Sequence, residues 1–170
     1  GNPAILIAAS DVTLDLSGFS LRVAAAEGIR IGGDRVTIRN GRVAMTSGAD
    51  AVYILTGADD TVLEDLTVSG AGSAGVRVQV GVASLTMSDC VLIGGQFGVT
   101  ESDADTASTL TKVQCRGQSR GGIYVGDRSV LDSCIVRDIG NAAGVSGVGI
   151  NCGIASTVRN CQVLDATGAG

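Results

Sequence analysis

Histidine and tryptophan are absent from this 170-residue chain, which also has one proline, Pro3, and only two phenylalanines and two tyrosines. The lack of histidine excludes histidine-based triads, histidine general bases and histidine metal ligands. No apolar run reaches the roughly 18 residues that a membrane-spanning helix needs. With one lysine, Lys112, and a formal net charge of -5, the chain offers no overall field that attracts nucleic acid.

Hydrophobic and charged residues are balanced as in a folded domain. Hydrophobic residues make up 45% of the chain, which is enough to build a core. Charged residues make up 17%, which is too little for a disordered chain. The length fits a single domain covering residues 1–170. The 26 glycines, combined with a single proline, stay below the level typical of low-complexity sequence.

A short internal repeat is the strongest pattern in the chain. Its unit is a glycine or alanine followed by a β-branched residue, any residue and, in most copies, a second β-branched residue. The first β-branched residues of successive units are 23, 24, 23, 24 and 27 positions apart. The six units begin at Gly28, Ala51, Gly75, Gly98, Gly122 and Gly149. A fixed period of this length, built from short alternating stretches, indicates a solenoid of β-strands.

A second apolar pattern runs in phase with the first. The stretch Ile38–Val43 has counterparts in every period, and Leu16–Leu21 fits the same frame upstream. Two columns are predicted to point inward: Ile29/Val52/Val76/Val99/Ile123/Ile150 and Leu21/Val43/Val68/Leu92/Cys115/Val136/Val163. Between them lies the column Gly18/Asn40/Asp65/Asp89/Lys112/Ser133/Asn160. Because Asn, Asp and Gly tolerate left-handed backbone, this column predicts a turn.

These patterns predict an all-β, single-stranded parallel β-helix of about seven coils. No stretch carries a sustained helical period, and glycine recurs too often for helix interiors. Residues 5–21, followed by residues 36–41, resemble the opening coils of right-handed parallel β-helix proteins of the pectate-lyase-like superfamily. That resemblance implies a right-handed coil and an extracellular, cell-surface or virion-surface location, as in secreted bacterial proteins and phage tailspikes. It leaves activity open, since the fold hosts lyases, hydrolases, epimerases and non-catalytic modules.

The five cysteines are predicted to be small core residues. They are Cys90, Cys115, Cys134, Cys152 and Cys161, and each stands where other periods have an aliphatic residue. A buried free cysteine behaves as a small hydrophobe. Cys134 and Cys161 lie one coil apart, so a disulfide between them stays open as an alternative.

The outward positions of the glycine-led strands carry the candidate glycan-binding residues. They are Arg30, Tyr53, Arg77, Tyr124 and Asn151, with Thr100 in the same column. Arginine matches carboxylates or sulfates, and tyrosine offers a flat face for a sugar ring. We expect the small residues at 28, 51, 75, 98, 122 and 149 to flank this column on the outside, so that the long side chains stand above a low surface.

No catalytic residue is predicted. The carboxylates near this strand are Glu101, Asp103 and Asp105, and Glu101 falls at an inward position, which predicts a bulged or loosened coil there. Asp103 and Asp105 are a weak candidate for Ca²⁺, and no other cofactor is indicated. In the resembled superfamily, hydrolases carry a Gly-His-Gly element and epimerases a histidine, neither of which is present here.

The sequence therefore favours a non-catalytic, extracellular or surface-displayed scaffold that binds a polysaccharide, with an anionic glycan as the hypothesis from the Arg and Tyr residues. Two alternatives stay open: a polysaccharide lyase or hydrolase domain, and a purely structural tailspike or filament shaft. We expect no nucleic acid partner and no membrane span. We also expect the ends of the solenoid to be covered by other segments of a longer protein or by other subunits.

Overall fold

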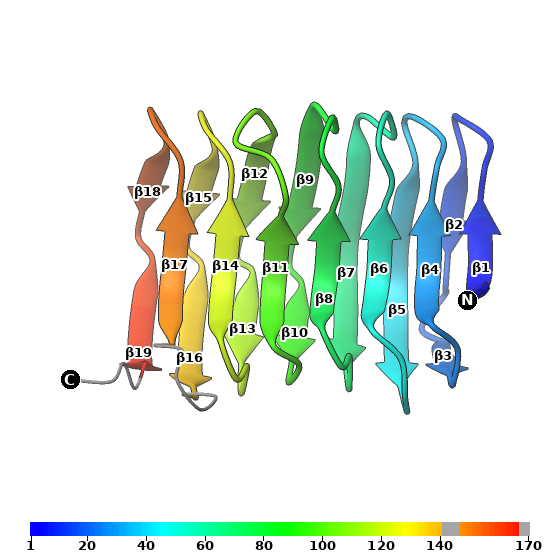
Figure 1. The fold of residues 1–170 in the computed structure, drawn as a ribbon, viewed down its shortest axis with the longest axis horizontal. Helices are drawn as coiled ribbons and strands as arrows, with labels where there is room; N and C mark the ends of the chain where they lie inside the picture. The colour runs from blue at the N-terminus through cyan, green and yellow to red at the C-terminus, as the bar shows by residue number, and fades with distance from the viewer. Residues whose placement is uncertain (141–146, 167–170) are drawn as a thin grey trace.

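The computed structural model describes residues 1–140 and 147–166, which form a parallel β-solenoid (Figure 1). These residues contain nineteen strands in two sheets and no helix, so none of their elements is a helix able to cross a membrane. All strand pairs are parallel, as successive coils of a solenoid require. The predicted fold class is confirmed.

Sheet A contributes one strand to each of seven coils. Its order follows the chain: β1 (Pro3–Ile7), β4 (Glu27–Ile31), β6 (Asp50–Ile54), β8 (Ala74–Val78), β11 (Phe97–Glu101), β14 (Gly121–Val125) and β17 (Val148–Cys152). These strands contain the glycine-led repeat. The predicted repeat unit is therefore one coil.

Sheet B lies behind sheet A and is bent into two arms. The proximal arm contains β2 (Thr13–Asp15), β9 (Ser84–Ser88), β12 (Ala107–Thr111), β15 (Val130–Asp132) and β18 (Thr157–Arg159). The distal arm contains β3 (Ser20–Val23), β10 (Val91–Ile93), β13 (Gln114–Arg116), β16 (Ile135–Ile139) and β19 (Gln162–Ala166). The long strands β5 (Thr37–Met45) and β7 (Thr61–Ser69) run through both arms.

The bend between the arms is the predicted turn column. Asn40, Asp65, Asp89, Lys112, Ser133 and Asn160 all have φ between 48 and 57°. The first coil departs from the predicted frame, because Leu14 rather than Leu16 pairs with Ile38, while Leu21 pairs with Val43 as expected. Two extra residues are accommodated at the bend, where Ser17 and Gly18 both have positive φ.

The interior is built from the predicted apolar columns. Ile29, Val52, Val76, Val99 and Ile123 are fully buried on sheet A, and they face a buried column on the distal arm. That second column contains Val43, Val68, Leu92, Cys115 and Val136. Aliphatic and β-branched side chains pack well on a pleated, stacked surface, which explains their repetition.

The glycine column of the repeat faces inward, and the prediction that it flanks the outer surface is wrong. A Cβ on Gly98 would lie 2.5 Å from Cys115 Sγ, and one on Gly122 would lie 2.3 Å from Val136 Cγ1. The strands are irregular at this position: Glu27 pairs with Asp50 and Ile29 pairs with Val52, but the register contains no pair between Gly28 and Ala51. The backbone rotates there, so the residue before the glycine points outward and the glycine meets the opposite sheet.

All five cysteines are free thiols. Cys90, Cys115 and Cys134 are fully buried, and burial raises the pKa of all three, to about 11 for Cys90 and Cys134. Cys161 Sγ accepts a hydrogen bond from the Cys134 backbone N–H at 3.4 Å. The cysteines thus serve as core residues, and the alternative of a Cys134–Cys161 disulfide is not realised in this structure.

Candidate functional site

The predicted glycan-binding residues form one continuous row on the outer face of sheet A. Arg30 pairs in register with Tyr53, Tyr53 with Arg77, and Arg77 with Thr100. Thr100 pairs with Tyr124, and Tyr124 with Asn151. We call this line of residues the Arg/Tyr row. The structure therefore brings all five candidates together, with adjacent strands about 4.8 Å apart.

A second outward row changes the electrostatics of this surface. It consists of the residues before the glycines: Glu27, Asp50, Ala74, Phe97, Gly121 and Val148. Arg30 Nε lies 2.5 Å from Glu27 Oε2, and Arg77 Nε lies 2.9 Å from Asp50 Oδ2. The carboxylate of each pair is mostly buried, with side-chain exposures of 12% for Glu27 and 9% for Asp50. The two arginines are therefore neutralised and do not favour an anionic chain.

The two tyrosines of the row differ in their surroundings. The Tyr53 hydroxyl accepts a hydrogen bond from Gln79 Nε2. Tyr124 packs edge-to-face against Phe97, with ring centroids 5.3 Å apart and an interplanar angle of 83°. Gly121 leaves room for this ring, since a Cβ there would lie 2.1 Å from Tyr124 Cε2. Tyr124 and Phe97 thus form an aromatic pair across the fifth and sixth of the seven coils.

A pocket of about 260 Å³ opens beside this aromatic pair. Tyr124 and Asn151 line it together with Glu101, Ser102 and Asp103, and Ala104, Val125, Gly126 and Gly153 complete the lining. Arg30, Tyr53 and Arg77 do not line it. We call it the Tyr124 pocket. Burial raises the pKa of Tyr124, so its hydroxyl stays protonated and able to donate at neutral pH.

Glu101, which the register predicted to point inward, lines the pocket. Its carboxylate accepts hydrogen bonds from Ser108 Oγ and, at 2.5 Å, from the Gly126 backbone N–H. Burial raises its pKa to about 7, although both hydrogen bonds act to lower it. The coil is regular on one side of Glu101 and loosened on the other: Glu101 pairs with Val78, but its pairing with the next coil stops at Thr100. The Gly126 N–H of the next coil therefore bonds to the Glu101 side chain, and together with Ser108 it satisfies the buried carboxylate.

Asp103 and Asp105 organise a loop next to the same pocket. Asp103 Oδ1 accepts from the Asp105 backbone N–H at 3.3 Å, and its Oδ2 accepts from Gly81 N–H at 3.2 Å. Within residues 1–140 and 147–166, no cluster of three or more acidic, cysteine or histidine side chains is arranged to hold a metal. The Asp103 oxygens are used by the backbone, so the structure adds no support for Ca²⁺ at this loop.

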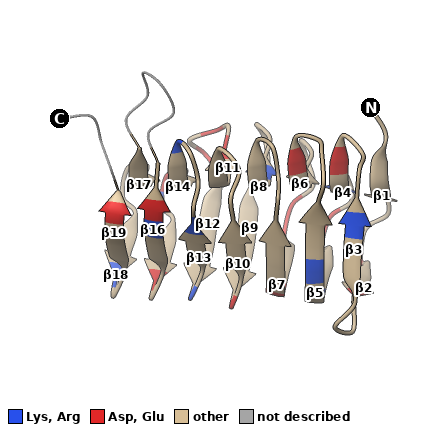
Figure 2. Cartoon of the chain, turned by 90° about the horizontal axis from the view of Figure 1, so that it is seen from below, with Lys and Arg blue, Asp and Glu red and all other residues tan. Residues whose placement is uncertain are grey.

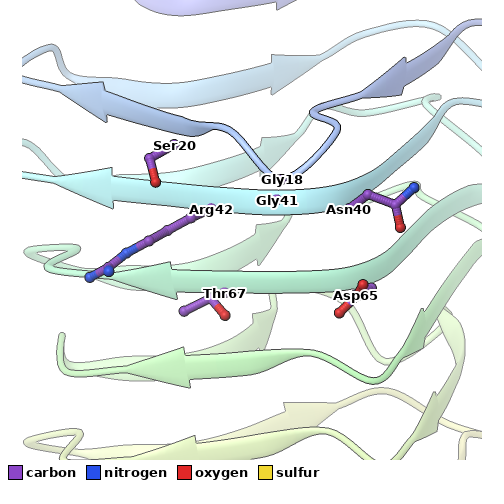
Figure 3. A pocket seen from close by; sticks show the side chains of 7 residues that line it. All are labelled: Gly18, Ser20, Asn40, Gly41, Arg42, Asp65 and Thr67. Carbon is purple, nitrogen blue, oxygen red and sulfur yellow. The ribbon is translucent and has the colours of Figure 1, made fainter.

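A second hollow lies on the distal arm, where the sequence indicated no site. A groove of about 460 Å³ is lined by Gly18, Ser20, Asn40, Gly41, Arg42, Asp65 and Thr67 (Figure 3). It shares Ser20 and Arg42 with an adjoining hollow of about 270 Å³ that is also lined by Arg22 and Ala44. We call the two together the distal groove. Its side chains alternate with core residues and differ from coil to coil, so the repeat gave no signal for them.

No family model, curated protein or solved structure matches this chain. What the Tyr124 pocket and the distal groove can bind therefore follows from their own residues and geometry.

Proposed function

We propose that this chain is a non-catalytic module of the pectate-lyase-like type, displayed at a cell or virion surface, that binds a polysaccharide in the Tyr124 pocket. The observation that carries the proposal is the Tyr124 ring, held by Phe97 beside a pocket lined by Asn151, Ser102 and Asp103. An aromatic face with nearby amide, hydroxyl and carboxylate groups suits a sugar ring and its hydroxyls. The solenoid supplies a rigid support for it.

The chemistry of this pocket favours a neutral sugar over an anionic one. Glu101 and Asp103 line it, and no Lys or Arg does so among the described residues. The arginines of the neighbouring row are already paired with Glu27 and Asp50. A sugar carboxylate would meet like charge in this pocket, whereas hydroxyl groups find acceptors there.

Affinity electrophoresis in gels containing dextran, xylan or galactomannan tests the proposal. We expect one of these neutral polymers to retard the native chain, and Tyr124→Ala to abolish most of the retardation. Tyr53→Ala is the matched control, since Tyr53 belongs to the same row and lies outside the pocket. Unretarded migration in all three gels, or equal losses in both variants, contradicts the proposal.

One observation favours a second candidate function, polysaccharide cleavage. Glu101, with its pKa raised to about 7, lines the same pocket as Asp103, and a protonated acid beside a second carboxylate is the arrangement used in glycoside hydrolysis. Both oxygens of Glu101 already accept hydrogen bonds from the coil, which argues for a structural role. Release of reducing ends from the same three polymers, lost in Glu101→Gln, would establish cleavage instead.

A further inference from the structure

Two outward rows on the distal arm carry arginine without acid, although Asp138 on β16 and Asp165 on β19 are exposed on the same arm. The side chains of each row are related by the strand register. One row is Ser20, Arg42, Thr67, Val91, Gln114, Ile135 and Gln162; the other is Arg22, Ala44, Ser69, Ile93, Arg116, Arg137 and Leu164. The two rows contain four arginines and no carboxylate. We call this surface the basic face.

The arginines of the basic face differ from six other basic residues in their partners. Arg30, Arg35, Arg39, Arg77, Lys112 and Arg159 each form an ion pair with a carboxylate. Within the described part of the chain, Arg22, Arg42, Arg116 and Arg137 form none. Arg42 Nη2 donates to Ser69 Oγ at 3.1 Å, and Arg116 Nε is buried without an acceptor. Arg120 and Arg128 also form no ion pair and lie outside the rows, so four of the six arginines without an ion pair in the described residues belong to the basic face.

The surrounding carboxylates lie outside these rows. Figure 2 shows basic residues on the neighbouring strands β3 and β5, and acidic residues on β4 and β6 of sheet A and at the ends of β16 and β19. Asp65 at the bend and Asp138 near the end of β16 border the face, and both are at left-handed positions, with φ of 48 and 55°. Neither forms an ion pair with an arginine of the basic face among the described residues. The local field along the two rows is therefore positive.

The distal groove shows what kind of group these arginines are suited to bind. Arg22 and Arg42 stand on adjacent strands, offset by two residues in the register, and both are exposed and line the same hollow. A guanidinium forms paired hydrogen bonds with a carboxylate or sulfate. Ser20, Thr67 and Asn40 line the same groove with hydroxyl and amide groups that match sugar hydroxyls (Figure 3). Asp65 also lines the groove, but the Arg42 side chain points away from it (Figure 3), so the anion site lies at the end of the groove with Arg22 and Arg42.

The second arginine pair extends the face along the solenoid axis. Arg116 and Arg137 are partners in register on β13 and β16. Three strand spacings, about 14 Å, separate the coil of Arg42 from that of Arg116. An extended polymer lying along the axis therefore meets both pairs. The rows contain no aromatic side chain on which nucleic acid bases stack, which favours a polysaccharide.

We infer that the basic face binds an acidic polysaccharide, bearing carboxylate or sulfate groups, along the solenoid axis, with its first anionic group held by Arg22 and Arg42. This site lies on the sheet behind the Tyr124 pocket and does not depend on the function proposed for that pocket. The ligand class is set by the unpaired guanidinium groups together with the flanking hydroxyls.

Three polymers with one backbone test the inference: dextran, carboxymethyl-dextran and dextran sulfate of equal length. We expect the native chain to bind at least one charged polymer at least about tenfold more tightly than dextran, and the affinity to fall with salt. Carboxymethyl-dextran and dextran sulfate distinguish a carboxylate ligand from a sulfate ligand. Arg22→Gln/Arg42→Gln is expected to remove most of the preference for charge, and Arg42→Lys to retain part of it.

The matched control is Arg35→Gln/Arg39→Gln, which removes the same charge from arginines already paired with Asp11 and Asp15. Equal loss in this control, or equal binding of dextran and the charged polymers, overturns the inference. Tighter binding of a single-stranded oligonucleotide than of either charged dextran also overturns it. Tyr124→Ala should leave binding of the charged polymers unchanged, so failure here and failure of the Tyr124 pocket are distinguishable. Circular dichroism confirms that each variant is folded.

Discussion

Arg77 Nε lies 2.9 Å from Asp50 Oδ2, and this contact joins two adjacent coils across sheet A. Asp50 Oδ1 also accepts the Ala74 backbone N–H at 3.0 Å, so one buried carboxylate holds both a side chain and a strand of the next coil. The pair explains why a surface containing arginine carries no free positive charge. It also makes Asp50 a structural residue.

Asp50→Ala is therefore expected to destabilise the solenoid by about 2–3 kcal/mol, because it leaves the Ala74 N–H and the Arg77 guanidinium without their acceptor. Urea denaturation followed by circular dichroism measures the free energy of unfolding. Asp11→Ala is the matched control, since the Asp11–Arg35 pair is solvent-exposed and its loss should matter much less. Equal effects in the two variants would show that the Asp50 contact adds nothing beyond a surface ion pair.

Glu101 is expected to make the stability of the protein depend on pH. Burial raises its pKa from 4.5 to about 7, so the folded protein holds this proton more tightly than the unfolded chain does. The resulting stabilisation is present below about pH 4.5 and is lost as the pH rises toward 7, by about 3 kcal/mol at most.

Glu101→Gln tests this dependence. The variant should lose that part of the pH dependence and be more stable than the native chain at pH about 8, where the native carboxylate is ionised. Thermal unfolding at a series of pH values measures it, with Glu64→Gln as a control outside the pocket. A native and a Glu101→Gln chain with parallel pH profiles would contradict the account of this carboxyl.

The inward column accepts alanine at Ala51, but Gly98 is expected to tolerate no side chain. Gly98→Ala should cost about 1–3 kcal/mol, because its Cβ would lie 2.5 Å from Cys115 Sγ and 2.6 Å from the Gly122 carbonyl oxygen. Gly32→Ala is the control, since its Cβ would lie 3.4 Å from the nearest atom, the flexible Leu55 Cδ1. Denaturant midpoints compare the two. A Gly98→Ala chain as stable as Gly32→Ala would place this column outside the core.

The thiols are expected to fall into two classes of reactivity. Cys90, Cys115 and Cys134 are buried with raised pKa, whereas Cys152 and Cys161 are partly exposed. Because the thiolate is the reactive form, Ellman's reagent should modify no more than the latter two in the native chain and all five after unfolding. Rapid modification of all five without denaturant would contradict the packed interior.

The repeat predicted most of the fold because each coil must bury the same positions. The inward columns through Ile29 and Val43 and the left-handed column through Asn40 appear in the structure where the spacing placed them. The glycine column was misplaced because strict alternation assumes a regular strand, whereas the backbone rotates at Gly28. The first coil was misaligned because its two additional residues at the bend leave the apolar spacing ambiguous.

The candidate site was predictable only in part. The register that aligns Arg30 with Asn151 follows from the repeat, so the Arg/Tyr row was found. The charge of Arg77 in this row is neutralised by Asp50, which lies 27 residues earlier in the chain. The repeat did not place Asp50 among the residues flanking the row. The basic face was missed because its residues differ from coil to coil, and only the ion pairs made elsewhere show that its arginines are unpaired.

Amide chemical shifts of the labelled chain, titrated with oligosaccharides from partially hydrolysed dextran, xylan and galactomannan, test the central claim most directly. The account predicts that one of the three shifts Ser102, Tyr124 and Asn151, and that Tyr124→Ala abolishes these shifts while leaving the rest of the spectrum folded. Shifts centred on Arg30 and Arg77, or no shifts with any of the three, would contradict binding in the Tyr124 pocket.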